Sequence, residues 1–86
     1  MVSGGFDPLH AGHLNLLEHA RTLGVVVEVV VERGEWVSLK HSVLLHESDR
    51  VRLVASLKVV DKAHLNPDPN GDCSCLVRRL KPSIYL

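Results

Sequence analysis

Apolar and polar residues follow one another in blocks that predict alternating strands and helices. Residues 25–31 are almost all valine, interrupted only by Glu28, which is typical of a strand buried on both faces of a parallel sheet. The preceding residues 9–23 carry an apolar stripe at helical spacing, formed by Leu9, Leu16, Leu17, Ala20 and Leu23. Gly24 stands where the C-cap of that helix belongs.

The second half of the chain continues this alternation after a polar connection over residues 32–46. Acidic and capping residues at 47–49 predict the start of another helix, with Val51, Val54, Ala55 and Leu57 facing inward. The remaining expected elements are a short strand within residues 59–65, a turn over 66–72, a helix around Leu76, Val77 and Leu80, and a strand over 84–86. Residues 1–3 can form only the end of a first strand.

This order of elements predicts an α/β fold with a parallel sheet and right-handed crossovers, formed as a single domain by residues 1–86. In such sheets ligands bind beyond the carboxyl ends of the strands, at the switch point of the topology. The glycine-containing turn of residues 4–13 follows the first strand. We therefore expect this turn to lie at the binding edge.

The amino-acid composition of the chain argues against several classes of function. The 86 residues contain ten basic and ten acidic side chains, which argues against non-specific attraction to nucleic acid or to an anionic membrane. No apolar run approaches the roughly 20 residues that span a bilayer, and we expect no secretory leader before the glycine turn. The two cysteines, Cys73 and Cys75, do not form a disulfide framework. A cytoplasmic location is expected.

The candidate chemistry lies in residues 2–13. Gly4 and Gly5 leave the backbone uncovered, so a large anion can approach the peptide N–H groups. The following helix start adds unpaired N–H donors. His10 and His13 are three residues apart and project from one side of that opening turn. This arrangement suits a polyphosphate.

Residues 5–13, with the H-x-G-H pattern of residues 10–13, resemble the signature of the cytidylyltransferase-like nucleotidyltransferases. Residues 47–52 and 57–61 are similar to a later block of the same family. The nearest patterns are those of glycerol-3-phosphate cytidylyltransferases, archaeal-type FAD synthases and heptose-phosphate nucleotidyltransferases. The similarity extends over nearly the whole chain.

The resemblance implies a Rossmann-like three-layer α/β/α fold and an enzyme that transfers a nucleoside monophosphate from CTP or ATP to a phosphorylated acceptor, with release of pyrophosphate. No covalent intermediate is expected. It implies Mg²⁺ accompanying the nucleotide without protein ligands of its own, and a homodimer. The implied catalytic residues are His10, His13 and Lys40, and the implied nucleotide-binding residues are Gly4, Gly5, Phe6, Asp7, His10, Gly12, His13 and Arg50.

The sequence also departs from the family pattern. Relatives have a longer first strand, and they continue beyond residues 84–86 into an acceptor loop and a final nucleotide-binding segment. The chain therefore resembles a family member truncated at both ends, and we interpret it as a fragment of a longer protein. The alternative function is a non-catalytic or weakly active nucleotide- or phosphate-binding module of the same fold.

Several residues have simpler interpretations that the sequence leaves open. His10 and His13 could bind a transition metal together with Asp7, although convincing further ligands are lacking. Asp7 could be a helix cap. Lys40 could be a solvated loop residue, Trp36 a packing residue, and Arg50 a partner of Glu47 or Asp49. The remaining histidines are expected at the surface or in loops: His19, His41, His46 and His64.

Overall fold

A parallel sheet lies at the centre of the computed structural model, which describes residues 1–23, 26–82 and 84–85. Its three strands are adjacent in the order β1-β2-β3. They are β1 (Val2–Gly4), β2 (Glu28–Val31) and β3 (Lys62–Leu65), and both pairs run parallel. The predicted α/β fold with a parallel sheet is confirmed, but the order of the described strands contains no reversal and hence no switch point.

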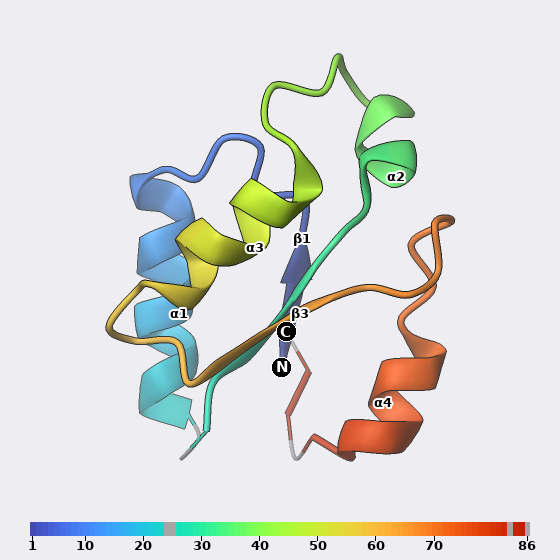
Figure 1. The fold of residues 1–86 in the computed structure, drawn as a ribbon. Coiled ribbons are helices and arrows are strands. Elements are labelled where there is room, and N and C mark those ends of the chain that lie inside the picture. Colours follow the sequence, from blue (N-terminus) through green and yellow to red (C-terminus); the bar gives the residue numbers. More distant parts are fainter. Residues whose placement is uncertain (24–25, 83, 86) are drawn as a thin grey trace.

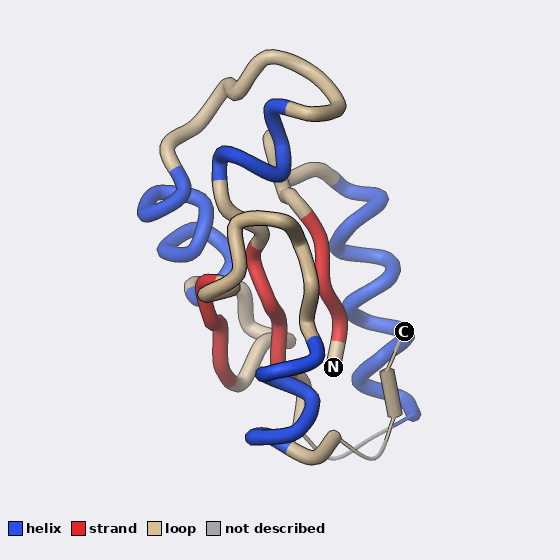
Figure 2. Tube along the Cα trace, turned by 90° about the vertical axis from the view of Figure 1, so that its right-hand side faces the viewer, coloured by secondary structure: helices blue, strands red, loops and turns tan. Residues whose placement is uncertain are grey.

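Helices cover both faces of this sheet. Figure 1 shows α1 and α3 on one side of the strands and α4 on the other, and in Figure 2 the strands lie side by side. The helices are α1 (Ala11–Leu23), α2 (Gly34–Ser38), α3 (Glu47–Ala55) and α4 (Ser74–Leu80). Within the described ranges, none has both the length and the apolar character needed to cross a membrane. The structure therefore has the expected α/β/α layers.

The valine-rich strand forms both halves of the core. Val29 and Val31 pack into a cluster with Leu17 of α1 and Val54 of α3. Val30 packs on the opposite face, in a cluster with Met1, Cys73 and Leu76. Successive side chains of a strand point to opposite faces. An uninterrupted run of valines is therefore what a strand between two helical layers requires.

Some elements differ from the sequence prediction. Helix α1 begins at Ala11 instead of residue 9, and the short helix α2 lies within the stretch predicted to be a polar connection. Val60 belongs to a turn after α3, because its N–H donates to the carbonyl oxygen of Leu57. Ile84 and Tyr85 are not in a strand. The predicted C-cap Gly24, the strand residue Val25 and Leu86 lie outside the described residues.

Arg50 joins the segments at the carboxyl end of the sheet. Its side chain is fully buried. Its Nη1 donates to the carbonyl oxygen of Gly5 at 2.7 Å and to that of Glu32 at 2.6 Å, and its Nε donates to the carbonyl oxygen of Leu45 at 3.0 Å. These carbonyls belong to the residues just after β1, just after β2 and just before α3. One guanidinium thus fixes three separate chain segments.

Asp7 makes a second link between two of these segments. Its carboxylate accepts one hydrogen bond from the N–H of Leu44 and one from the N–H of Leu45, each at 2.7 Å. The Asp7 side chain is buried, with 8% of its surface exposed. Buried carboxylates need such donors to offset their desolvation. Asp7 therefore ties the turn after β1 to the loop that precedes α3.

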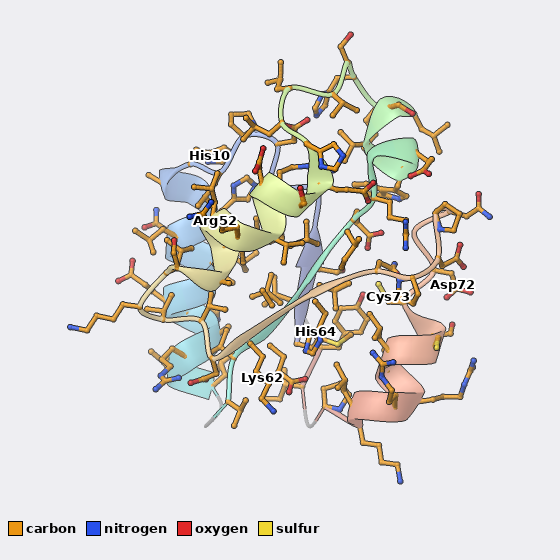
Figure 3. All side chains as sticks on the ribbon, viewed as in Figure 1. His10, Arg52, Lys62, His64, Asp72 and Cys73 are labelled. Carbon is orange, nitrogen blue, oxygen red and sulfur yellow. The ribbon has the colours of Figure 1, made fainter. Side chains whose placement is uncertain are left out.

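We predict that Arg50→Met destabilises the fold by about 3 kcal/mol or more, because one buried and two part-buried carbonyl oxygens lose a charged donor. Urea unfolding followed by circular dichroism measures this loss. Arg52→Met is the matched control. Arg52 is exposed on the same helix (Figure 3), and its substitution should change the free energy of unfolding by no more than about 0.5 kcal/mol. Equal stability of the two variants would contradict the structural role assigned to Arg50.

Candidate functional site

A pocket of about 300 Å³ opens beyond the carboxyl end of β1. One wall comes from the turn between β1 and α1, and the other comes from α2 and the residues that follow it. The lining residues are Gly5, Phe6, Asp7, Pro8, His10, His13, Trp36, Val37, Lys40 and His41. The glycine turn therefore lies at the carboxyl edge of the sheet, as its position after the first strand predicts.

The two histidines stack against each other at the start of α1. Their ring centroids are 3.9 Å apart and the ring planes differ by 28°. The N–H of Gly12 donates to Nδ1 of His10 at 3.0 Å, and the N–H of His10 donates to Nδ1 of His13 at 3.2 Å. Because each Nδ1 accepts a hydrogen bond, each neutral ring carries its proton on Nε2. Both imidazoles are thus set to act as Nε2–H donors.

The side chain of His10 also caps α1, since it accepts a hydrogen bond from the second helical residue, Gly12. Asp7 does not have the capping role that the sequence suggested for it, because its two oxygens accept the N–H groups of Leu44 and Leu45. The same capping device recurs at α3, where His46 accepts from the N–H of Ser48. A histidine can therefore fix its own ring by capping a helix.

Gly12 leaves room for the ring of His10. A Cβ atom at this position would lie 2.8 Å from Cε1 and 3.0 Å from Nδ1 of His10. The first distance is shorter than any ordinary contact, so a larger residue would displace the imidazole. The glycine of the H-x-G-H pattern thus permits the observed position of the preceding histidine ring.

Phe6 supports His13 from the other side. Its ring is buried and its centroid lies 4.8 Å from that of His13. The backbone of Phe6 is in the left-handed region, with φ of 54°, a conformation uncommon for a residue with a side chain. Burial lowers the pKa of His13 below its ordinary value of 6.5, and the nearby His10 lowers it further. His13 is therefore neutral near pH 7 in the absence of an anion.

The backbone of the glycine turn offers further donors. Among the described residues, no acceptor takes the N–H groups of Gly5 and Phe6. Both residues line the pocket that contains the imidazoles. Backbone N–H groups at a turn before a helix form a favourable site for an anion. The pocket thus combines backbone donors, two imidazole donors and the ammonium group of Lys40.

The structure brings together six of the residues assigned to the site from the sequence: Gly5, Phe6, Asp7, His10, His13 and Lys40. Gly12 is not among the lining residues, but it leaves room for the ring of His10, which is one of them. Gly4 belongs to β1, and its carbonyl oxygen accepts the N–H of Glu32. Arg50 is fully buried and does not line the pocket. It donates to main-chain oxygens rather than to Glu47 or Asp49, so its place in this structure is that of a support beneath the site.

Besides Pro8 in the turn after β1, three residues of the pocket wall were not assigned to the site from the sequence: Trp36, Val37 and His41. They belong to α2 and to the residues directly after it. Trp36 and Lys40 are four residues apart, which is the spacing of neighbours on one helical face. This spacing was visible in the sequence, but it has meaning only once residues 34–38 are known to be helical.

The described part of the pocket has few protein oxygens that could bind Mg²⁺. Within residues 1–23, 26–82 and 84–85, no group of three or more His, Cys, Asp or Glu side chains could hold a metal ion. Asp7 is the acidic residue of the pocket wall, and both of its oxygens already accept backbone N–H groups. These residues fit an ion held mainly by the phosphates of a bound nucleotide.

Comparison with known proteins gives the same family over the whole chain. The family model described as "Cytidylyltransferase-like" matches residues 1–86. The FAD synthase of Methanohalobium evestigatum is 43% identical over 70 residues, which cover 81% of this chain and 47% of that protein. The FAD synthase of Archaeoglobus profundus is 39% identical over 84 residues, covering 98% of this chain and 53% of that protein. The chain thus spans about half the length of these relatives.

A solved structure agrees in fold as well as in sequence. The lipopolysaccharide core biosynthesis protein from Thermoplasma volcanium superimposes with a TM-score of 0.88 and is 36% identical. The match covers 99% of this chain and 69% of that protein. The arrangement of strands and helices described above is therefore shared with an experimentally determined structure.

We predict that Gly12→Ala weakens the binding of inorganic tripolyphosphate about tenfold or more, because the displaced His10 ring loses a charge-assisted hydrogen bond. Alanine favours helix formation over glycine, so the stability should stay equal or rise by up to about 1 kcal/mol. Isothermal titration calorimetry and thermal unfolding measure the two effects. Unchanged affinity would show that the position of the His10 ring does not matter for anion binding.

The pKa of His13 predicts a pH dependence of stability. Burial lowers the folded-state pKa below the ordinary value of 6.5, so the unfolded chain binds the proton more readily. The stability associated with neutral His13 is present above about pH 6.5 and is lost as the pH falls through the lowered pKa. His13→Gln should therefore lose less thermal stability than the wild type between about pH 7.5 and about pH 5.5. Parallel losses would refute the burial of this imidazole.

Proposed function

The chain belongs to the cytidylyltransferase-like family, and from this premise we propose that it transfers a nucleoside monophosphate from a nucleoside triphosphate to a phosphorylated acceptor. The proposal rests chiefly on one observation: two stacked imidazoles, each held through its Nδ1, share a pocket with the backbone donors of Gly5 and Phe6. This is a set of donors suited to a triphosphate.

In the proposed reaction a phosphate oxygen of the acceptor attacks the α-phosphorus of the nucleotide. A bond from phosphorus to that oxygen forms, the bond to the bridging oxygen of the β-phosphate breaks, and pyrophosphate leaves. The acceptor oxygen is already anionic, so the step needs no general base. Catalysis then depends on alignment of the two phosphates and on stabilisation of the developing charge.

The hydrogen-bond donors and the lysine of the pocket each have a part in this step. The Nε2–H groups of His10 and His13 donate to the phosphate oxygens, and the N–H groups of Gly5 and Phe6 bind the triphosphate chain. The Lys40 ammonium neutralises charge on the pyrophosphate. Mg²⁺, bound through the nucleotide phosphates, supplies further charge neutralisation. Arg50 and Asp7 keep the turn in place from below, through the hydrogen bonds described above.

ATP and FMN are the first donor and acceptor to test. The relatives in the comparison carry the name FAD synthase, and FAD consists of FMN joined to AMP through a pyrophosphate bond. CTP with a phosphorylated polyol or sugar is the second pair, because the family is described by cytidylyl transfer. Homodimerisation stays a prediction, and size-exclusion chromatography at several concentrations tests it.

We expect His10→Ala and His13→Ala each to lower the rate of pyrophosphate release by about 100-fold or more, since each removes a donor to developing negative charge. The assay contains the protein, Mg²⁺, ATP or CTP, and FMN or a phosphorylated polyol. His19→Ala is the control, because His19 is exposed on the same helix and does not line the pocket. Unchanged release in both pocket variants would overturn the catalytic assignment.

The same assay separates the enzyme from a binding module. Binding of a nucleoside triphosphate without pyrophosphate release, with every acceptor, would favour a phosphate-binding function of the same pocket. The chain spans about half the length of the relatives named above, so this outcome is a real alternative for the 86 residues.

A further inference from the structure

Trp36 lines the pocket, but the proposed reaction assigns it no role. It is half-buried in α2, and it is the single tryptophan of the chain. Its indole packs against Gly71 and lies near Gly5, two glycines from different parts of the chain, and the Lys40 ammonium lies over its ring. These contacts together indicate that the position of the indole is closely specified.

The indole of Trp36 packs against Gly71, and we call this glycine the seat of the indole. A Cβ atom at this position would lie 2.1 Å from Cδ1 and 2.2 Å from Nε1 of Trp36. The φ angle of Gly71 is 84°, in the region that favours glycine. Both the available space and the backbone conformation therefore require glycine here. The pyrrole edge of Trp36 lies directly on the Gly71 backbone.

The turn that presents Gly71 is held by its own side chains. The N–H of Asp68 donates to Oδ1 of Asn66 at 3.0 Å, and the N–H of Asn70 donates to Oδ1 of Asp68 at 2.8 Å. The N–H of Gly71 donates to the carbonyl oxygen of Asp68 at 3.2 Å. Asn66 is fully buried, and its Nδ2 donates to the carboxylate of Glu32. The seat of the indole is thus anchored to the end of β2.

The opposite edge of the indole lies close to the phosphate-binding turn. Cζ3 of Trp36 would be 3.5 Å from a Cβ atom built on Gly5, which is ordinary van der Waals distance. The next residue of α2, Val37, is buried and would approach the same position at 3.2 Å. The indole therefore spans the space between the turn at Gly71 and the turn after β1.

Lys40 lies on this fixed ring. Its Nζ is 4.8 Å from the ring centroid, within the range of a cation–π interaction. The helical turn continues through Lys40, whose N–H donates to the carbonyl oxygen of Val37. A side chain in such a turn leans back towards the residue four positions earlier. Among the described residues, no carboxylate lies within ion-pair distance of the Lys40 ammonium.

We propose that Trp36 is a positioning residue: seated on Gly71, its indole holds the Lys40 ammonium at the pocket for the polyphosphate chain of the substrate. A free lysine side chain has to be ordered when it binds phosphate, and ordering reduces the affinity. An aromatic surface beneath the ammonium orders it in advance without neutralising its charge. This role rests on the proposed function, since it assigns a polyphosphate to the same pocket.

A double-mutant cycle with inorganic tripolyphosphate as the probe tests the coupling. We expect Trp36→Leu to weaken binding about two- to fivefold and Trp36→Phe, which keeps an aromatic face, to weaken it less. Lys40→Met should weaken binding by a larger factor. Because Trp36 acts through Lys40, the double variant Trp36→Leu/Lys40→Met should bind no more weakly than Lys40→Met alone.

Lys62→Met is the control for loss of one positive charge, because Lys62 is exposed on β3 at the end of the molecule away from His10 (Figure 3). If the affinity losses of Trp36→Leu and Lys40→Met multiply in the double variant, the positioning role is overturned and the proposed function stays intact. Absence of any tripolyphosphate binding by the wild type would overturn both. Loss of binding on Lys40→Met, but not on His10→Ala or His13→Ala, would contradict the proposed function alone.

Tryptophan fluorescence tests the same contact without altering Trp36. Tripolyphosphate should change the emission of the wild type and of Lys62→Met, because the anion binds the ammonium that lies against the indole. Lys40→Met should lose this change, and Lys40→Arg should retain it. An equal change of emission in Lys40→Met would overturn the proposal even if the substitutions at Trp36 prevented folding.

Discussion

The guanidinium of Arg50 holds together the three segments on which the site depends. It donates to the carbonyl oxygens of Gly5, Glu32 and Leu45 from a fully buried position. The adjoining strands β1 and β2 have three and four residues, so their ladder contributes few hydrogen bonds. A buried cation that depends on main-chain oxygens is stable only when all of them are in place. The carboxyl edge of the sheet is therefore assembled as one unit.

The chemistry of the pocket follows from this assembly. Both oxygens of Asp7, the acidic residue of the pocket wall, accept backbone N–H groups of the loop at residues 44–45. Nδ1 of His10 and Nδ1 of His13 each accept a backbone N–H, so Nε2 is the nitrogen of each ring that can donate to a ligand. Burial lowers the pKa of His13 below its ordinary value. Both Asp7 oxygens are thus occupied, and hydrogen-bond donors are concentrated in the pocket.

Local sequence patterns predicted the parts of this structure that depend on neighbours in the chain. The strand within the valine run and the place of the glycine turn and the two histidines at the carboxyl edge could be predicted because strand burial and helix starts are local features; the strand covers only Glu28–Val31 of the predicted residues 25–31. The burial of Arg50 and the seat of Trp36 on Gly71 could not be predicted, since both join segments that are distant in the sequence. Helix α2 was missed because its five residues bury little apart from Val37.

The most direct test of this account is an NMR titration of the isotopically labelled protein with inorganic tripolyphosphate. We expect the largest chemical-shift changes at the amide groups of Gly5 and Phe6 and at the imidazole nitrogens of His10 and His13, with a rise in the pKa of His13 on binding. These groups should respond together at one affinity. Changes confined to other parts of the molecule, or imidazoles that titrate identically with and without the anion, would contradict the central claim.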